Sequence, residues 1–311
     1  MSALREPLAA LPLEPWEATR ATLGLYVQVV GKIRLAVTPP RNHWWHVTLY
    51  VTATGLTTGR MALDGRDFQV DFDFLRHRLV VARSTGEPVH IELHDGLSVQ
   101  AFHGRLMTIL EGFDIRPDLD ARPYRSPYGR IPFEADDEHA SYDAEAVVCY
   151  WRALRWVDGL LAEFAGRFRG KQSPVHLFWH SFDLALTRFS GRLAPPRPDA
   201  DRVTRMAYDE EVISVGFWPG DPTVREATLY GYAAPEPEGL PSVRLEPEEA
   251  RWVDVGSGHI AYLSFEAVRT SRDPRGKALT FLEGLYAAAA RTAGWDVGRL
   301  ADPWVGGQGP R

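Results

Sequence analysis

The sequence has a single cysteine and no long apolar run. Among its 311 residues, Cys149 stands alone, so a disulfide within the chain is excluded and a cysteine-based metal site has no support. No uninterrupted apolar stretch approaches the roughly 20 residues that a membrane span needs. Residues 1–16 also lack the cationic start and apolar core of a signal peptide. We therefore expect a cytoplasmic protein without a membrane partner.

Excess positive charge and the common cofactor motifs are missing as well. The formal net charge is -6 and the isoelectric point is near 5.9, and no basic run alternates with aromatic residues, so a nucleic-acid partner is not expected. The chain has no Gly-rich dinucleotide fingerprint, phosphate loop, H-E-x-x-H, G-x-S-x-G or paired C-x-x-C. These absences leave the cofactor and the reaction type unassigned.

The chain does contain an internal similarity. Residues 16–35 and 151–170 align without a gap and share seven of twenty positions. The shared pairs are Trp16/Trp151, Ala18/Ala153, Arg20/Arg155, Gly24/Gly159, Leu25/Leu160, Gly31/Gly166 and Arg34/Arg169. After one dropped residue, the similarity continues to Trp45-His46 and Trp179-His180. This periodicity predicts two copies of one structural unit.

Each copy has the pattern of a helix, several antiparallel strands and a second helix, which predicts an α+β fold. We expect helices over 15–37, 97–111, 143–168 and 274–293. Strands are expected over 44–53, 68–74, 78–82, 89–93, 175–189, 211–218, 227–233 and 259–264. The predicted organisation is a first unit at 1–113, a linker or long ordered loop at 114–141, a second unit at 142–295 and a flexible tail at 296–311. The two sheets would join about a pseudo-twofold axis, with the long helices on one face and a ligand cleft on the other face or at the seam.

The first candidate site is the run Asn-His-Trp-Trp-His at 42–46. On a regular strand, His43 and Trp45 would share one face, while Trp44 and His46 would share the other. Aromatic surface combined with imidazole suits the wall of a ligand site. The alternative is that both histidines are hydrogen-bonded structural residues beside packed tryptophans.

The second candidate lies in the apolar segment that contains His176, Trp179, Asp183 and Arg188. A carboxylate removed from water must be paired, hydrogen-bonded or protonated, so a charge there is either a structural partner or a working group. Alternation places Asp183 and Thr187 on one face and His176 and Arg188 on the other. A structural Asp-Arg pair is the alternative interpretation.

Two further ideas concern metal binding and a helix start. Four histidines, at 43, 46, 176 and 180, could together hold a metal, but His176 and His180 would lie about 13 Å apart on a strand, so we assign no metal site. Tyr142 precedes a predicted helix, where it could contact an anion or act as an acid or base. The alternative is simple capping of that helix by Asp143.

Several long motifs resemble those of one family. They are GKIRL at 31–35, NHWWH at 42–46, EHASYD at 138–143, SPVH at 173–176, FW at 178–179, SFDLALTRFSGR at 181–192 and GFWPG at 216–220. The chain resembles, over nearly its whole length, a bacterial family catalogued only as a domain of unknown function, which implies no activity. His180 departs from the pattern, where the resemblance leads us to expect a small residue, and this weakens any site that depends on it.

The leading functional hypothesis is an enzyme that acts on a small polar or anionic molecule in a Trp/His-lined cleft between the repeats. His46 or His176 would serve as acid or base, and Asp183 would orient or activate it. The expected substrate contacts are His43, Trp44, Trp45, Tyr142, Trp179 and Arg188. The alternatives are a non-catalytic small-molecule-binding protein and a structural or partner-binding protein without a site.

Overall fold

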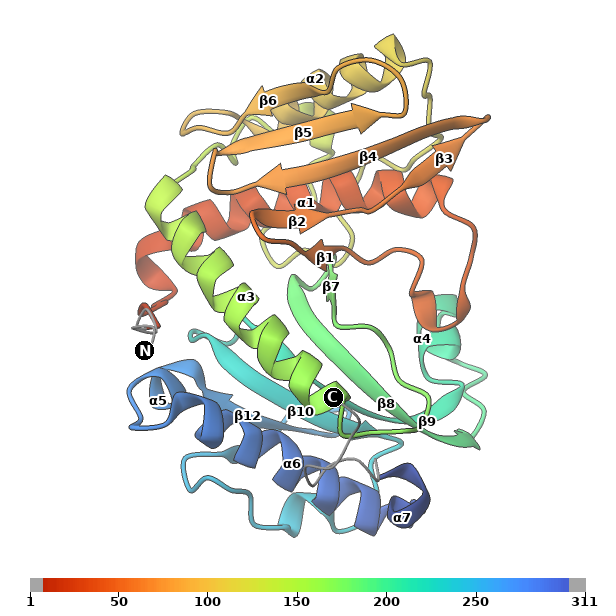
Figure 1. Ribbon diagram of the computed structural model, residues 1–311, viewed down its shortest axis with the longest axis vertical. Coiled ribbons are helices and arrows are strands. Elements are labelled where there is room, and N and C mark those ends of the chain that lie inside the picture. The colour runs from red at the N-terminus through yellow and green to blue at the C-terminus, as the bar shows by residue number, and fades with distance from the viewer. Residues whose placement is uncertain (1–7, 302–311) are drawn as a thin grey trace, which may run out of the picture.

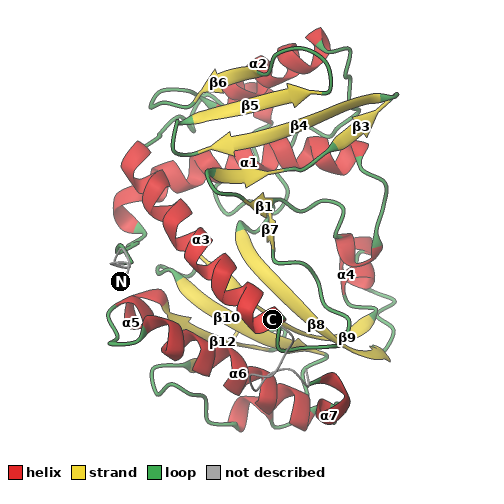
Figure 2. Ribbon diagram, viewed as in Figure 1, coloured by secondary structure: helices red, strands yellow, loops and turns green. Residues whose placement is uncertain are grey.

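A computed structural model describes residues 8–301. The fold is α+β, as predicted, and is built on two antiparallel sheets with helices packed beside them (Figures 1 and 2). None of the helices in the described part of the chain combines the length and the hydropathy that a membrane crossing requires.

The first sheet has the strand order β1-β2-β4-β5-β6, and β3 pairs with β4. Its strands are β1 (Tyr50–Val51), β2 (Gly55–Thr57), β3 (Met61–Leu63), β4 (Arg66–Asp73), β5 (Arg78–Arg83) and β6 (Val89–Glu92). Helices α1 (Glu17–Val37) and α2 (Val99–Gly112) pack beside it. The Phe102 ring of α2 stacks on Tyr26 of α1 and on Phe72 of β4, at centroid distances of 4.1 and 6.4 Å. These rings join both helices to the buried face of the sheet.

The second sheet has the order β11-β12-β10-β9-β8-β7. Its strands are β7 (His176–Phe178), β8 (Asp183–Leu193), β9 (Glu210–Trp218), β10 (Thr228–Ala234), β11 (Arg251–Asp254) and β12 (His259–Ser264). The long helices α3 (Ala144–Ala165) and α6 (Pro274–Thr292) pack on one of its faces, with α3 crossing diagonally in front of the strands in Figure 1. The short elements are α4 (Arg202–Ala207), α5 (Phe265–Arg269) and α7 (Val297–Leu300), and the 3-10 turns η1 (Glu14–Trp16), η2 (Asn42–Trp44), η3 (Phe133–Ala135) and η4 (Leu240–Ser242).

The two sheets meet at their short edge strands. Leu49, just before β1, and Leu177 of β7 exchange both backbone hydrogen bonds, at 3.0 and 2.8 Å. Both leucine side chains are fully buried. The buried apolar residues of the two sheets form one continuous core cluster, so the sheets share an interior as well as a border.

The expected strand over 44–53 is replaced by the turn η2 and the short strand β1. His43 and Trp44 have φ values of 52° and 62°, in the left-handed region, which a strand cannot contain. The expected strand over 175–189 is likewise interrupted between β7 and β8, where Phe182 has φ of 60°. The face assignments made for residues 42–46 therefore do not hold, because alternation requires extended backbone.

Asp143 is the N-cap of α3, as one interpretation of its position predicted. Its carboxylate accepts hydrogen bonds from the backbone amides of Glu145 and Ala146, at 2.9 and 3.1 Å. The helix ends at Ala165, three residues before the expected end. Residues 114–141 contain only the turn η3, and their assignment as a linker or long ordered loop stays a prediction. The division into two units stays a prediction, and of the expected tail, residues 302–311 lie outside the described part.

The internal duplication also stays a prediction. Trp16 and Trp151 are both buried, but another matched pair occupies different environments. Gly31 lies inside α1 against Trp179, whereas Gly166 is the C-cap of α3. The aligned residues therefore do not all have the same structural role.

Candidate functional site

A cavity of about 610 Å³ lies against the second sheet. Asp183 and Thr187 of β8 line it. Arg188, one residue further along, points to the opposite face, where its guanidinium lies 3.4 Å from the ring centroid of Phe164 in α3. The alternation predicted for Asp183, Thr187 and Arg188 is thus confirmed. The cavity occupies the face of the sheet that α3 leaves free.

Eleven aromatic side chains line the cavity. They come from η2 and the residue after it, from the loops around positions 124 and 179, from the end of α4, and from five strands of the sheet. The aromatic residues are Trp44, Trp45, Tyr124, Phe178, Trp179, Phe189, Tyr208, Trp218, Tyr230, Tyr232 and Tyr262. A wall of this kind favours a ligand with a large apolar or aromatic surface.

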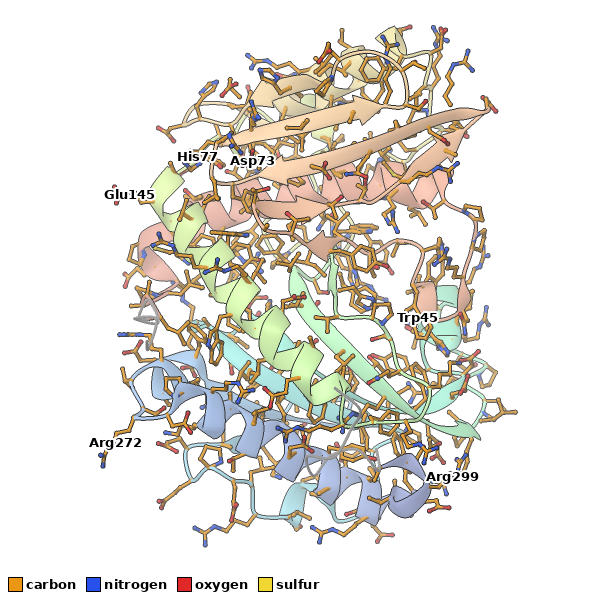
Figure 3. The ribbon with its side chains drawn as sticks, in the orientation of Figure 1. Trp45, Asp73, His77, Glu145, Arg272 and Arg299 are labelled. Atoms are coloured by element: carbon orange, nitrogen blue, oxygen red, sulfur yellow. The ribbon has the colours of Figure 1, made fainter. Side chains whose placement is uncertain are left out.

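The turn η2 closes one side of the cavity against α4. The Trp44 indole Nε1 donates a 3.1 Å hydrogen bond to the Val203 carbonyl, which ties the turn to α4. The Arg202 guanidinium lies 5.9 Å from the Trp44 ring centroid. Trp45, which Figure 3 shows beside α4, also lines the cavity. The left-handed backbone of η2 is what brings both consecutive tryptophans to this wall.

Trp179 reaches the cavity across the surface of α1. A Cβ atom built on Gly31 would lie 2.2 Å from Trp179 Cγ, a distance that no packed side chain tolerates. Gly31 therefore lets the indole lie directly on the helix backbone. This contact brings α1, from the first half of the chain, into the construction of the cavity wall.

Asp183 is the buried carboxylate of the cavity, with 9% of its surface exposed. Ser181 Oγ donates to Oδ1 and the Tyr230 hydroxyl donates to Oδ2. Burial, followed by the nearby carboxylate, raises the pKa of Tyr230 well above its usual value, so this phenol keeps its proton. Asp183 is therefore held by two neutral hydroxyl donors.

Gly216 makes the bond between Tyr230 and Asp183 possible. Ala185, Gly216 and Tyr230 are cross-strand neighbours on β8, β9 and β10. A Cβ on Gly216 would lie 2.6 Å from the Tyr230 hydroxyl oxygen and 2.2 Å from the Leu184 carbonyl oxygen. The Tyr230 ring thus lies flat across β9 over the missing side chain, and this position carries its hydroxyl to the carboxylate.

A second set of hydroxyl groups runs across the same sheet face. Thr187 Oγ1 lies 3.0 Å from Ser214 Oγ, and the Tyr208 hydroxyl lies 2.8 Å from the Tyr232 hydroxyl. The rings of Tyr230 and Tyr232 are stacked, with centroids 6.4 Å apart. The two hydroxyls of each pair are hydrogen-bonded to each other, and together they form a polar stripe on the otherwise apolar cavity wall.

A charged cluster surrounds His43. Lys171 Nζ lies 2.7 Å from His43 Nε2 and also pairs with Glu210, while His43 Nδ1 lies 3.3 Å from Asp209 Oδ1. Burial, followed by the Lys171 charge, lowers the pKa of His43. Within the described chain, His43, Asp209 and Glu210 are the one group close enough to share a metal ion. The Lys171 ammonium already occupies the space between the His43 and Glu210 ligand atoms, so these residues fit an ion-pair network better than a metal.

The structure does not bring His46 and His176 to the cavity. His46 is 3% exposed and its Nδ1 accepts a 3.2 Å hydrogen bond from the Arg41 amide. His176 has no exposed surface and neither ring nitrogen has a partner. Its ring packs edge-on against Phe178 at 4.7 Å, and burial lowers its pKa to about 3. Both histidines are packed side chains in this conformation.

Arg188 and Tyr142 also lie elsewhere. Arg188 is 1% exposed and donates to the Phe164 carbonyl near the end of α3. The Tyr142 hydroxyl lies 3.2 Å from His77 Nδ1, at the turn between β4 and β5. Of the residues chosen from the sequence, the cavity gathers His43, Trp44, Trp45, Trp179 and Asp183.

Several cavity residues were missed in the sequence. Tyr230 and Tyr232 alternate on β10, and Ser214 and Gly216 alternate on β9, so a period of two placed each pair on one face. The GFWPG motif also contains Gly216 and Trp218. What the pattern could not indicate is that Tyr230 crosses a neighbouring strand to reach Asp183.

Fold and site together define an α+β protein with an aromatic cavity on the free face of an antiparallel sheet. Residues 8–302 match the model of a family described as "Family of unknown function (DUF5996)". The chain belongs to this family, which confirms the expected membership of a family of unknown function. No curated protein and no solved structure matches the chain.

Proposed function

We propose that this protein binds a small organic molecule in the aromatic cavity. The observation that carries the proposal is Asp183, a buried carboxylate held in position by Ser181 and Tyr230 within a wall of aromatic side chains. The volume of about 610 Å³ is in the range of small-molecule sites. Many apolar contacts with a few oriented polar groups are the usual composition of such sites.

His43, Trp44, Trp45 and Trp179 are the further contacts that we propose for the ligand. The three tryptophans supply flat apolar surface, and indole rings gain binding energy from burial beyond that of aliphatic side chains. His43 lies 5.2 Å from Trp45 by ring centroids and joins the wall to the Lys171 network. These residues come from η2 and from the loop before β8, so ligand binding would depend on both.

A neutral fluorescent dye tests whether the cavity accepts a ligand. N-phenyl-1-naphthylamine, which becomes bright in apolar sites, should bind the wild-type protein. Ala207→Trp, on the cavity side of α4, should abolish the signal because the indole fills the space. Ala62→Trp on an exposed position of β3 makes the same exchange far from the cavity and should leave the signal unchanged. A signal that Ala207→Trp does not reduce would contradict the proposal.

The natural ligand can then be sought without assuming its identity. Equilibrium dialysis of the protein against a bacterial metabolite extract, followed by mass spectrometry, should show at least one small molecule enriched with wild type. The same molecule should be absent from the Ala207→Trp sample and present with Ala62→Trp. Equal retention by all three proteins would indicate binding outside the cavity.

Catalysis is the second candidate function, and one observation favours it. Two hydroxyl groups donate to a buried carboxylate that faces a cavity, so Asp183 is oriented and could take a proton from a bound molecule. Asp183→Asn keeps the shape of the side chain and removes its basicity. A variant that binds the ligand normally and leaves it unconverted would support catalysis, whereas conversion at the wild-type rate would exclude this role for Asp183.

We further propose a cytoplasmic location and no nucleic-acid partner. Both rest on the sequence, with its single cysteine and net charge of -6. A filter-binding assay with mixed DNA and RNA at low salt should show no retention above that of a neutral control protein.

A further inference from the structure

Asp183 has two hydroxyl partners and no cationic one. Among the described residues, no lysine, arginine or histidine lies within ion-pair distance of its carboxylate. Neutral donors stabilise a carboxylate, but they leave its full negative charge in a largely buried place. A positively charged group on a bound molecule would compensate this buried negative charge most effectively.

The aromatic rings around Asp183 carry negative potential on their faces. Trp179, Trp218, Tyr230 and Tyr262 line the part of the cavity formed by the same sheet and loop. The face of an aromatic ring attracts a cation within about 6 Å, and the attraction grows when water is excluded. The carboxylate and the ring faces therefore both favour a ligand group that carries a positive charge.

The protein's own cations that line the cavity are occupied elsewhere. Lys32 pairs with Asp120 at 3.2 Å, and Arg125 pairs with Asp201 at 2.9 Å. Arg202 lies over the Trp44 ring, on the wall formed by η2 and α4. None of these three neutralises Asp183.

The two histidines of the cavity do not supply the missing charge either. Burial is the main cause that lowers the pKa of both His43 and His180, so each is neutral at physiological pH. The nearby Asp183 acts in the opposite direction on His180 without overcoming the effect of burial. Burial raises the pKa of Tyr232 well above its usual value, and its hydroxyl lies 2.8 Å from that of Tyr208.

We infer that the ligand is an organic cation, with an ammonium or similar group placed at Asp183 and an apolar or aromatic body against the ring wall. This inference rests on the proposed function of the cavity. It assigns Asp183 and Tyr230 to charge recognition, and the tryptophans to recognition of the ligand body. The acceptor positions of the carboxylate that Ser181 and Tyr230 leave free would receive the ligand's N–H donors.

A matched pair of probes separates charge from shape. 2-Phenylethylamine is a cation at neutral pH, and 2-phenylethanol is a neutral molecule of almost the same shape. Calorimetric titration, supported by quenching of the cavity tryptophans, should show the amine binding wild type at least about 10-fold more tightly, which corresponds to about 1.4 kcal/mol. Asp183→Asn should remove this preference. Asp199→Asn, which removes the same charge from an exposed position before α4, should preserve it.

The outcomes distinguish the ligand class from the cavity function. Equal or tighter binding of the alcohol to wild type would overturn the cation assignment while leaving cavity binding intact. Binding of the neutral dye without binding of the amine would also overturn the cation assignment and leave cavity binding intact. Loss of amine, alcohol and dye binding alike would overturn both proposals. The wild-type comparison alone decides the ligand class, so the test does not depend on the folding of Asp183→Asn.

Discussion

Replacing His176 by leucine should make the protein less sensitive to acid. His176 is fully buried, neither ring nitrogen has a hydrogen-bond partner, and burial lowers its pKa from 6.5 to about 3. Leucine has a similar volume and cannot be protonated, so the substitution removes a titration from the core with little change in packing.

The direction and size follow from the two protonation equilibria. The unfolded chain takes up a proton on this histidine as the pH falls through 6.5, whereas the folded chain resists until about pH 3. Acid therefore favours the unfolded state. The free energy of unfolding decreases as the pH is lowered from 6.5 towards 3. Between pH 7 and pH 5 the loss due to His176 comes to about 2 kcal/mol.

Urea unfolding at pH 7, 6 and 5, followed by circular dichroism, measures the effect. Burial also lowers the pKa of His43, His46, His103 and His180, so wild type should lose further stability in the same direction. The relevant quantity is therefore the difference between wild type and His176→Leu. Between pH 7 and pH 5, the variant should lose about 2 kcal/mol less of its free energy of unfolding than wild type loses.

A matched control makes the same exchange at an exposed histidine. His94→Leu alters a solvent-exposed ring and should leave the pH dependence of wild type intact. If His176→Leu loses as much stability as wild type between pH 7 and pH 5, the reasoning about its burial is wrong. A His176 ring proton that titrates near pH 6.5 in the folded protein by NMR would contradict that reasoning as well.

Three other substitutions test the geometry around the site. Gly216→Ala should cost roughly 1–3 kcal/mol in urea unfolding because its Cβ would clash with Tyr230 and backbone, whereas Gly104→Ala in open space on α2 should cost nothing; equal effects would refute the packing argument. Tyr230→Phe should lower the free energy of unfolding at pH 7 by about 1–3 kcal/mol, since Asp183 loses a donor; an unchanged value would mean that this bond contributes nothing. Asp143→Ala should cost about 1 kcal/mol through loss of the α3 cap, and Asp143→Asn much less; a larger cost for asparagine would contradict the capping role.

The regular elements could be predicted because their signals are local. Asp143 as an N-cap fixed the start of α3, and alternation around Asp183 and Arg188 assigned the two faces of β8 correctly. The turn η2 could not be predicted, because no local signal marks positive φ at His43 and Trp44, and the hydrogen bond from Trp44 to Val203 joins residues 159 positions apart. Local propensity gave an extended segment there, and packing overrode it.

The candidate site was only partly predictable for a related reason. Asp183 was found because a charge in an apolar strand is conspicuous in one sequence. Its donor Tyr230 lies 47 residues further on, and the contact depends on a missing side chain at Gly216. His176 was chosen for its chemistry, but a histidine can also be buried without any partner. Residue type indicates what a side chain can do, while only the fold decides which neighbours it meets.

The way the first and second parts of the chain share the cavity has a consequence for the size of the functional unit. Trp44 and Trp45 come from the first part of the chain, Asp183 and Tyr230 come from the second sheet, and Gly31 supports Trp179 across the division. Beyond the Leu49–Leu177 pair, a bound ligand would itself become a connection between the halves. Neither half expressed alone would recognise it. Separately produced halves would be expected to reassemble more readily in the ligand's presence, so the ligand would serve as part of the protein's interior.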